Sequence, residues 1–253
     1  MPLYGFLLIA ATASSFPFAG GGSLMGAQYP SAEAHPGAAV WAPRYILVSS
    51  LYRRYPSPDV NIETTALDPG RGVLAASVGA RYRYEGAEQH LLGGALDLGL
   101  RLGNRLSVGL SGAYDSEIKW SDMLRYGLSY AMWPRRTSQG TQPGLITAVD
   151  YDSSRRGDGR WRSSVLVAPI EGMKACWDHR FDGSNVLAAA YRLGSLEIQA
   201  SGSLLSQYSL AHYGFGLRFH DRGGWLGASW SSQDSVRHLS FEVTIPIGAQ
   251  TPR

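Results

Sequence analysis

The sequence has few of the features that stabilise many small secreted or globular domains. Its 253 residues include one cysteine, Cys176, which excludes a disulfide framework and a cysteine-rich zinc site. Charged residues make up 17% of the chain and hydrophobic residues 44%, so the composition is not that of a disordered chain. The net charge of +3, from 23 Lys and Arg against 20 Asp and Glu, is too small to indicate nucleic-acid binding.

The chain also lacks an apolar run of the roughly 18 residues that a membrane-spanning helix needs. The longest candidate, Leu3–Ala13, ends in a small-x-small triplet typical of a signal cleavage site, but no Lys or Arg occurs in the first 43 residues to form the cationic start of a signal. Residues 14–43 are rich in Gly, Ala, Ser and Pro and show no period. We expect residues 1–43 to be a flexible lead-in that serves as a signal or a plug.

From Gly72 onward, apolar residues alternate with small, polar or charged ones. The clearest segments are Gly72–Tyr84, Gln89–Leu102, Arg105–Ser116, Leu124–Trp133, and the later runs around residues 195–204, 211–220 and 238–247. Because successive side chains of a strand point to opposite faces, each segment predicts a strand with two unlike faces. Two polar loops are expected between them, around Arg135–Pro143 and Ser153–Gly159.

The number and length of these strands predict the fold class. We expect about twelve strands after Gly72, many of about 9–12 residues, with one or two more in Tyr45–Tyr52 and Val60–Ala66. Soluble strands average about 5–6 residues, whereas tilted membrane-spanning strands need about 9–11. A long meander closes to remove its edges. The sequence therefore predicts an all-β fold, an antiparallel up-and-down transmembrane β-barrel of about 12–14 strands over residues 44–253.

Alternation alone does not decide which face meets water. A soluble β-sandwich would bury the apolar face, whereas a membrane barrel turns it toward lipid and encloses the polar face. Here the polar register is filled mostly with Gly, Ser and Ala, and aromatic residues such as Tyr82, Tyr114 and Phe219 gather near strand ends. Trp and Tyr are enriched at membrane interfaces, so the pattern favours the membrane barrel.

In a membrane barrel the polar register lines the lumen, and it carries many charged residues. Our lumen-facing candidates are Arg81, Arg83, Asp97, Arg101, Arg105, Asp115, Arg125, Lys174, Asp178, Arg180, Arg192, Glu197, Arg218 and Glu242. Basic groups outnumber acidic ones, which would favour anions or phosphate headgroups. The alternative is an internal salt-bridge lattice that braces the barrel, and the interleaving of Asp and Glu with Arg favours this second interpretation.

One pair of residues is typical of catalysis. His238 and Ser240 share a face of the last predicted strand, which resembles the His and Ser of outer-membrane phospholipases. The motif of those enzymes continues Asn-Gly, whereas this chain continues Phe241-Glu242 without an orienting partner. We therefore expect a barrel without enzymatic activity, catalytic residues, cofactor or metal.

Two short stretches carry a family resemblance. Leu51–Pro58 and the glycine-aromatic strand Tyr213–Phe219 resemble segments of mitochondrial outer-membrane barrels: the eukaryotic porin, the import-channel barrel and the distribution-and-morphology barrel. The last predicted strand leads into Ile245-Pro246-Ile247-Gly248 and a polar tail, unlike the aromatic end of bacterial barrels. The porin type has nineteen strands, and at roughly 13–15 residues per strand and turn this chain can hold only a smaller barrel.

The resemblance implies a non-enzymatic protein of the outer membrane, mitochondrial rather than bacterial. It would anchor or assemble a tether or translocation complex, or conduct small solutes. The implied partners are membrane lipid and other outer-membrane or tethering-complex subunits, and no nucleic acid. A bacterial outer-membrane pore is the alternative, followed by a barrel lipid hydrolase and a soluble β-sandwich binding module.

Overall fold

The computed structural model describes residues 35–41, 46–55, 60–68, 73–85, 89–115, 124–137, 140–153, 160–204, 210–221, 224–233 and 236–246. Within these ranges no helix is both long and apolar enough to cross a bilayer. The one helical element described there is a short 3-10 turn, η3 (Ala38–Trp41).

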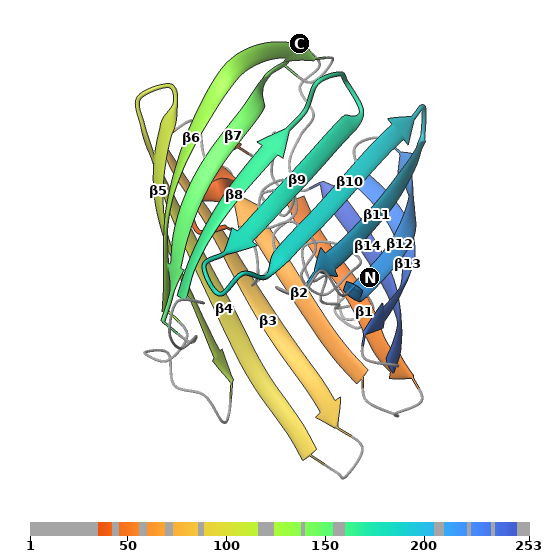
Figure 1. The fold of residues 1–253 in the computed structure, drawn as a ribbon. Coiled ribbons are helices and arrows are strands. Elements are labelled where there is room, and N and C mark those ends of the chain that lie inside the picture. Colours follow the sequence, from red (N-terminus) through yellow and green to blue (C-terminus); the bar gives the residue numbers. More distant parts are fainter. Residues whose placement is uncertain are drawn as a thin grey trace, which may run out of the picture.

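Across the described ranges, fourteen antiparallel strands form a closed barrel (Figure 1). The strands are β1 (Ile46–Tyr55), β2 (Val60–Asp68), β3 (Leu74–Glu85), β4 (Gln89–Leu102), β5 (Leu106–Asp115), β6 (Leu124–Thr137), β7 (Gly140–Asp152), β8 (Trp161–Val167), β9 (Met173–Arg180), β10 (Asn185–Leu193), β11 (Leu196–Leu204), β12 (Leu210–Asp221), β13 (Gly224–Gln233) and β14 (Val236–Pro246). Each pairs with the next, and β1 pairs with β14 over the whole of β1. Closure gives each strand a partner on both sides, which the interior of a bilayer requires of a sheet.

The two faces of the wall are opposite in character. On the outer face Leu98, Leu110 and Tyr126 are cross-strand neighbours and are 36%, 40% and 49% exposed. On the inner face Asp97 and Ser107 are buried. A soluble barrel would show the reverse arrangement. The prediction of an all-β, antiparallel transmembrane barrel is therefore confirmed, and the β-sandwich alternative is excluded.

Aromatic rings cluster at one end of the barrel, away from the end where β1 begins and β14 stops. Tyr126 and Tyr151 have ring centroids 6.4 Å apart, and Trp161 meets Tyr151 edge-on at 5.1 Å. On the next strand Trp177 and His179 lie 5.9 Å apart. These rings occupy strand ends, where Trp and Tyr favour the boundary between lipid and water.

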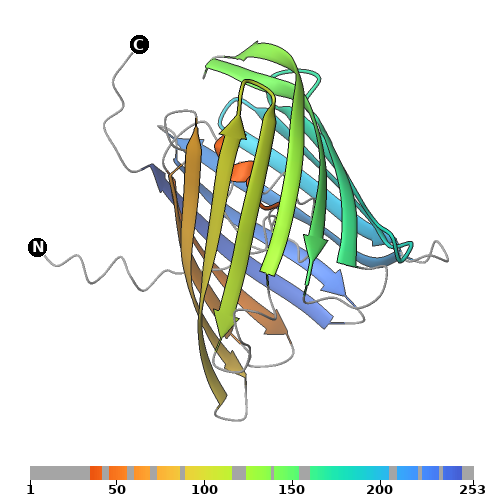
Figure 2. The same cartoon turned by 90° about the vertical axis from the view of Figure 1, so that its left-hand side faces the viewer.

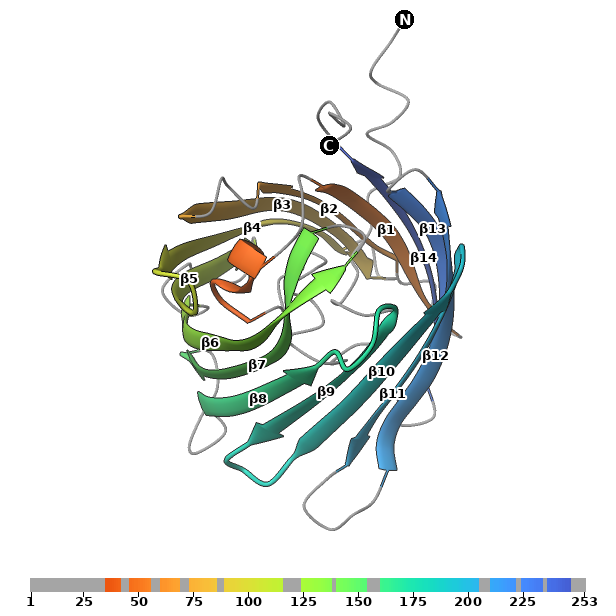
Figure 3. The same cartoon turned by 90° about the horizontal axis from the view of Figure 1, so that it is seen from above.

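The hairpin of β6 and β7 differs from the sequence-based expectation. We expected a polar loop around Arg135–Pro143, but β6 continues to Thr137 and β7 starts at Gly140. The end of this hairpin bends over the barrel opening (Figures 2 and 3). The bend has a local cause, since Trp133 adopts a positive φ of 51°. Just beyond it Pro134 pairs with Pro143, and two residues without N–H groups cannot form ladder hydrogen bonds there.

A charged residue on the outer face should therefore lower the stability of the barrel in lipid. The same residue at the next position, which faces the lumen, should not. We expect Leu110→Arg to destabilise the lipid-embedded barrel by about 2–4 kcal/mol because the residue points to hydrocarbon near the middle of β5. The matched control is Ser111→Arg, which points inward. Denaturant unfolding in lipid vesicles measures both, and equal destabilisation by the two variants would contradict the assigned faces.

Candidate functional site

A segment that precedes the first strand lies inside the barrel. His35, Pro36 and Gly37 are buried, and η3 after them contacts β3, β4 and β5 on their inner side (Figure 3). Of the lead-in predicted over residues 1–43, the structure describes 35–41, and the remainder lies outside the described residues. We call residues 35–41 the lumen segment.

The lumen segment rests on three glycines that are direct neighbours across the wall. Gly99 of β4 pairs with Gly109 of β5, which pairs with Gly127 of β6. A Cβ atom at Gly99 would lie 2.8 Å from Gly37 Cα, and one at Gly127 would lie 2.6 Å from Pro36 O. A Cβ at Gly109 would overlap the backbone of both Pro36 and Gly37. Only glycine permits this approach of two backbones, and we call these three residues the glycine seat.

Hydrogen bonds fix the lumen segment beside the glycine seat. The Gly37 N–H donates to Asp97 Oδ1 at 3.1 Å, and Ser107 Oγ donates to the Gly37 carbonyl at 3.4 Å. The Trp41 Nε1–H donates to Ser129 Oγ at 3.0 Å, and the hydroxyls of Ser107 and Ser129 are 2.6 Å apart. Asp97, Ser107 and Ser129 of the wall thereby find hydrogen-bond partners in the segment.

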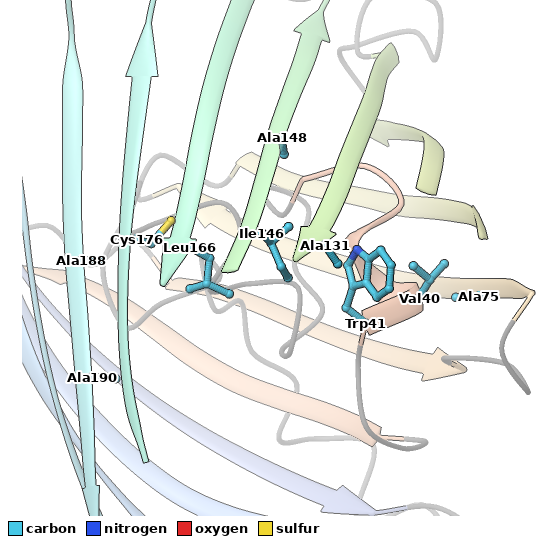
Figure 4. Close-up of a cluster of buried hydrophobic side chains, with 10 residues drawn as sticks. All are labelled: Val40, Trp41, Ala75, Ala131, Ile146, Ala148, Leu166, Cys176, Ala188 and Ala190. Atoms are coloured by element: carbon cyan, nitrogen blue, oxygen red, sulfur yellow. The ribbon is translucent and has the colours of Figure 1, made fainter. Parts of the chain in front are cut away.

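Trp41 also closes an apolar cluster on the inner wall. The cluster comprises Val40 and Trp41 of the lumen segment and small or aliphatic residues of the strands, among them Ala75, Ala131 and Ile146 (Figure 4). Arg101 lies 5.0 Å from the centroid of the Trp41 ring, a cation–π contact. The segment is therefore fixed by packing as well as by hydrogen bonds.

His35 lies at the start of the lumen segment, before the first strand. Its Nε2–H donates to the Val149 carbonyl at 3.1 Å and lies 3.9 Å from Asp150 Oδ2. Burial lowers the pKa of His35 from 6.5 to about 4; Asp150 opposes this shift, and the nearby cations Arg162 and Arg125 add to it. The imidazole is therefore neutral at pH 7 in the seated segment.

Next to His35, the inner face of β6, β7 and β8 carries ion pairs with equal numbers of basic and acidic side chains. Asp150 and Arg162 are cross-strand partners with a 2.7 Å contact, and Arg125 reaches Asp150 at 3.6 Å and its own partner Asp152 at 4.0 Å. We call these four residues the β6–β8 ion-pair group. Two cations face two carboxylates, which fits the salt-bridge lattice proposed from the sequence.

A second charged group lies on β9 to β12. Glu197 is the cross-strand partner of both Arg192 and Arg218. Arg218 Nη1 lies 3.1 Å from Glu197 Oε1, and His220 Nε2 lies 3.2 Å from Glu197 Oε2. Lys174 interacts electrostatically with Glu197, Arg218 and Arg192. We call these five residues the β9–β12 charged group.

Most of the predicted lumen residues whose side chains are described lie on the inner face. Asp97, Asp178, Glu197 and Arg218 are buried, and partly buried are Arg101, Arg125, Lys174, Arg180 and Arg192. The side chains of four others lie outside the described part of the chain; their backbones belong to β3, β5 and β14, and they are Arg81, Arg83, Asp115 and Glu242.

Arg105 is a correction. It lies in the turn before β5, is exposed, and donates from Nη1 to the hydroxyl of Tyr130 at 3.5 Å. Tyr130 belongs to the outer face. Period-two alternation holds only within a strand, and Arg105 lies one residue before the start of β5.

Of the two residues considered for catalysis, the one whose side chain is described packs within the wall. Ser240 is buried, and its hydroxyl lies 2.8 Å from that of Ser229. The side chain of His238 lies outside the described residues. Among the residues described, no group of three or more His, Cys, Asp or Glu could hold a metal ion.

The glycine seat was not singled out from the sequence, although three glycines on the inner register of consecutive strands are visible there.

Comparisons with known proteins find likeness of fold. No protein-family model matches the chain, and no curated protein matches it. The crystal structure of the Acinetobacter baumannii outer membrane protein Omp33 is similar, with a TM-score of 0.54 and 13% identity, over 81% of this chain and 98% of that one. A triple mutant of the Rhodopseudomonas blastica porin gives 0.43 and 8%, over 79% and 98%, and a TM-score this low carries no argument.

Filling the glycine seat should displace the lumen segment. We expect Gly109→Ala to weaken docking by about 1–3 kcal/mol because the added methyl group overlaps the Gly37 backbone. Hydrogen exchange of the Gly37 amide, which is bonded to Asp97, measures this. The control is Gly94→Ala on the same sheet, where the nearest atom to the added Cβ is 3.4 Å away. Unchanged exchange in Gly109→Ala would contradict the seat.

Docking of the lumen segment should also depend on pH. The pKa of His35 is lowered to about 4 when buried, so its contribution is complete above pH 6.5 and is lost as the pH falls toward 4. We expect the protection factor of the Gly37 amide, the ratio of its intrinsic to its observed exchange rate, to fall across this window. His35→Asn should flatten the dependence, and an unchanged profile in that variant would assign it instead to Asp150, which pairs with Arg162 and Arg125.

Proposed function

We propose that this chain is an outer-membrane pore that passes small hydrophilic solutes. The observation that supports this most directly is the inner wall, where hydroxyl and charged side chains face the enclosed space while Leu and aromatic residues face outward. A barrel of this pattern in a bilayer offers a polar path across it. An anchoring role would not need charged groups distributed over so many inward positions.

We further propose the bacterial class, which was the alternative in our sequence analysis. The fourteen described strands are an even number, as in bacterial single-chain barrels, whereas the eukaryotic porin type has nineteen. The likeness to Omp33 is one of fold alone and is compatible with this choice. No observation on the described residues favours the mitochondrial class. Binding to partner subunits of a tether or translocation complex stays a prediction.

The lengths of the connections support an orientation for the barrel. The segments between β5 and β6 and between β7 and β8 span residues 116–123 and 153–160, and both lie at the end opposite the start of β1. Connections at the other end are shorter, and β1 begins and β14 stops there. Bacterial barrels have short periplasmic turns and longer external loops, so we place the start of β1 and the bent β6–β7 hairpin on the periplasmic side.

The lumen segment gives this pore a built-in constriction. It fills space against β3, β4 and β5 and is fixed through Gly37 and Trp41. A fully plugged anchor is the second candidate function, and the burial of His35 and Trp41 inside the barrel is the observation that favours it. The two candidates differ in whether ions pass while the segment is seated.

Single-channel recording in planar bilayers separates them. We expect the full chain to conduct, and a variant lacking residues 35–41 to conduct more, because the deletion widens the path along β3 to β5. Trp41→Phe, which keeps an aromatic ring but loses the bond to Ser129, is the milder control, and its conductance should fall between the two. A silent full chain and a conducting deletion would favour the plugged anchor, and silence of both would overturn the pore.

A further inference from the structure

His35 is the residue of the lumen segment that can change charge in mildly acidic water. The other residues of the segment are Pro, Gly, Ala, Val and Trp, which carry no charge. The His35 ring is 0% exposed and lies against β6, where a Cβ atom on Gly127 would be 2.5 Å from the ring carbon Cε1. On β7 its Nε2–H donates to the Val149 carbonyl at 3.1 Å. The ring is therefore enclosed between the segment and the wall.

The second nitrogen of this ring is not arranged to carry a proton. A carbonyl oxygen only accepts hydrogen bonds, so the bond to Val149 assigns the proton of the neutral imidazole to Nε2. The Nδ1 atom of His35 is buried and has no hydrogen-bond partner among the described residues. Protonation would add an N–H donor at this atom, and a buried donor without an acceptor is unfavourable.

The charged groups around the ring also disfavour an imidazolium. Asp150 of β7 lies 3.9 Å from His35 Nε2. The same carboxylate lies 2.7 Å from Arg162 of β8 and 3.6 Å from Arg125 of β6, and Arg125 is 4.0 Å from Asp152. A protonated His35 would be a further cation beside a carboxylate that two arginines already contact. The pKa of His35 agrees with this geometry, since burial lowers it from 6.5 to about 4.

The position of the ring is coupled to the glycine seat. His35 precedes Pro36, whose carbonyl oxygen would lie 2.6 Å from the same Cβ atom on Gly127. Because the ring is 0% exposed, it reaches water only when the segment around it moves. Asp97 of β4 also faces the segment, through the Gly37 N–H, but a protonated carboxyl group still has an oxygen that accepts this bond. A change of charge at His35 is therefore the one that disturbs the seated segment.

We propose that His35 is a pH-sensitive switch: the neutral ring keeps the lumen segment on the glycine seat, and uptake of a proton from water at Nδ1 releases it. Docking favours the neutral ring, so the segment is fully seated above about pH 6.5 and is released progressively as the pH falls toward 4. Over this window the docking equilibrium weakens by on the order of a hundredfold. The consequence for conduction rests on the proposed function: release widens the path along β3 to β5.

Release can be measured without conduction. In the detergent-solubilised full chain, the NMR signal of the Trp41 Nε1–H reports its bond to Ser129, and Trp41→Phe assigns this signal. We expect it to move reversibly toward that of a water-exposed indole as the pH falls from about 7 to about 4.5, together with the signal of the His35 ring. His35→Gln, whose amide nitrogen can still donate to the Val149 carbonyl, should keep the docked signal throughout. A Trp41 signal that moves while His35 stays neutral would overturn the switch.

The control is His220→Gln, which removes another inward-facing histidine. His220 lies beside Glu197 on β12, and Figure 3 shows this strand across the barrel from η3. This variant should keep the acid response of Trp41. An acid response that disappears in His220→Gln and persists in His35→Gln would overturn the assignment to His35.

Conduction in planar bilayers tests the consequence for the pore. The full chain should conduct more at about pH 4.5 than at about pH 7, and His35→Gln should conduct equally at both. Release of Trp41 without a change in conductance would overturn the switch as a control of the pore. A chain that conducts at neither pH while Trp41 is released would instead overturn the proposed pore and keep the switch.

Discussion

The bilayer interior offers no hydrogen-bond partner to a backbone N–H or C=O group, and this constraint determines the rest of the molecule. It requires that the sheet close, which β1 and β14 achieve by pairing. Closure in turn sorts side chains by position in the strand, since alternate residues must face lipid or the enclosed space. Leu98 and Leu110 can remain exposed only because their surroundings are apolar, and Asp97, next to Leu98 but on the other face, must find partners inside.

The inner face has its own packing problem. A barrel of fourteen strands is too wide for its wall side chains to fill, and part of the space is taken by chain rather than by side chains. Three glycines in register make a surface flat enough for the Pro36–Gly37 backbone, and Ser107, Ser129 and Asp97 on the same strands satisfy its polar groups. The same residue type that weakens a soluble strand here permits a tight contact between two backbones.

Most of the fold could be predicted from the sequence, because period-two alternation is a local signal. The strands after Gly72 and the outward direction of Leu98 follow from it. The alternation gives wrong predictions where it stops. Arg105 lies in a turn, and the expected loop at Arg135–Pro143 is a bent hairpin. The glycine seat depends on which residues of β4, β5 and β6 are opposite one another, and the pairing of Glu197 with Arg192 and Arg218 is likewise a property of register. Register is the alignment of two strands, so the pattern within a single strand does not predict it.

The charges inside the barrel brace its wall, which is one of the two roles that the sequence leaves open. Both the bracing lattice and anion selection need Arg on the inner register, and they differ only in whether each Arg meets its own carboxylate. On β6 to β8 two cations and two carboxylates lie in adjacent pairs, so the field is cancelled locally and little remains to act on a solute. On β9 to β12 Glu197 contacts both Arg218 and His220, so one carboxylate holds two side chains of β12 against β11. Charged side chains thus brace the wall in two separate places.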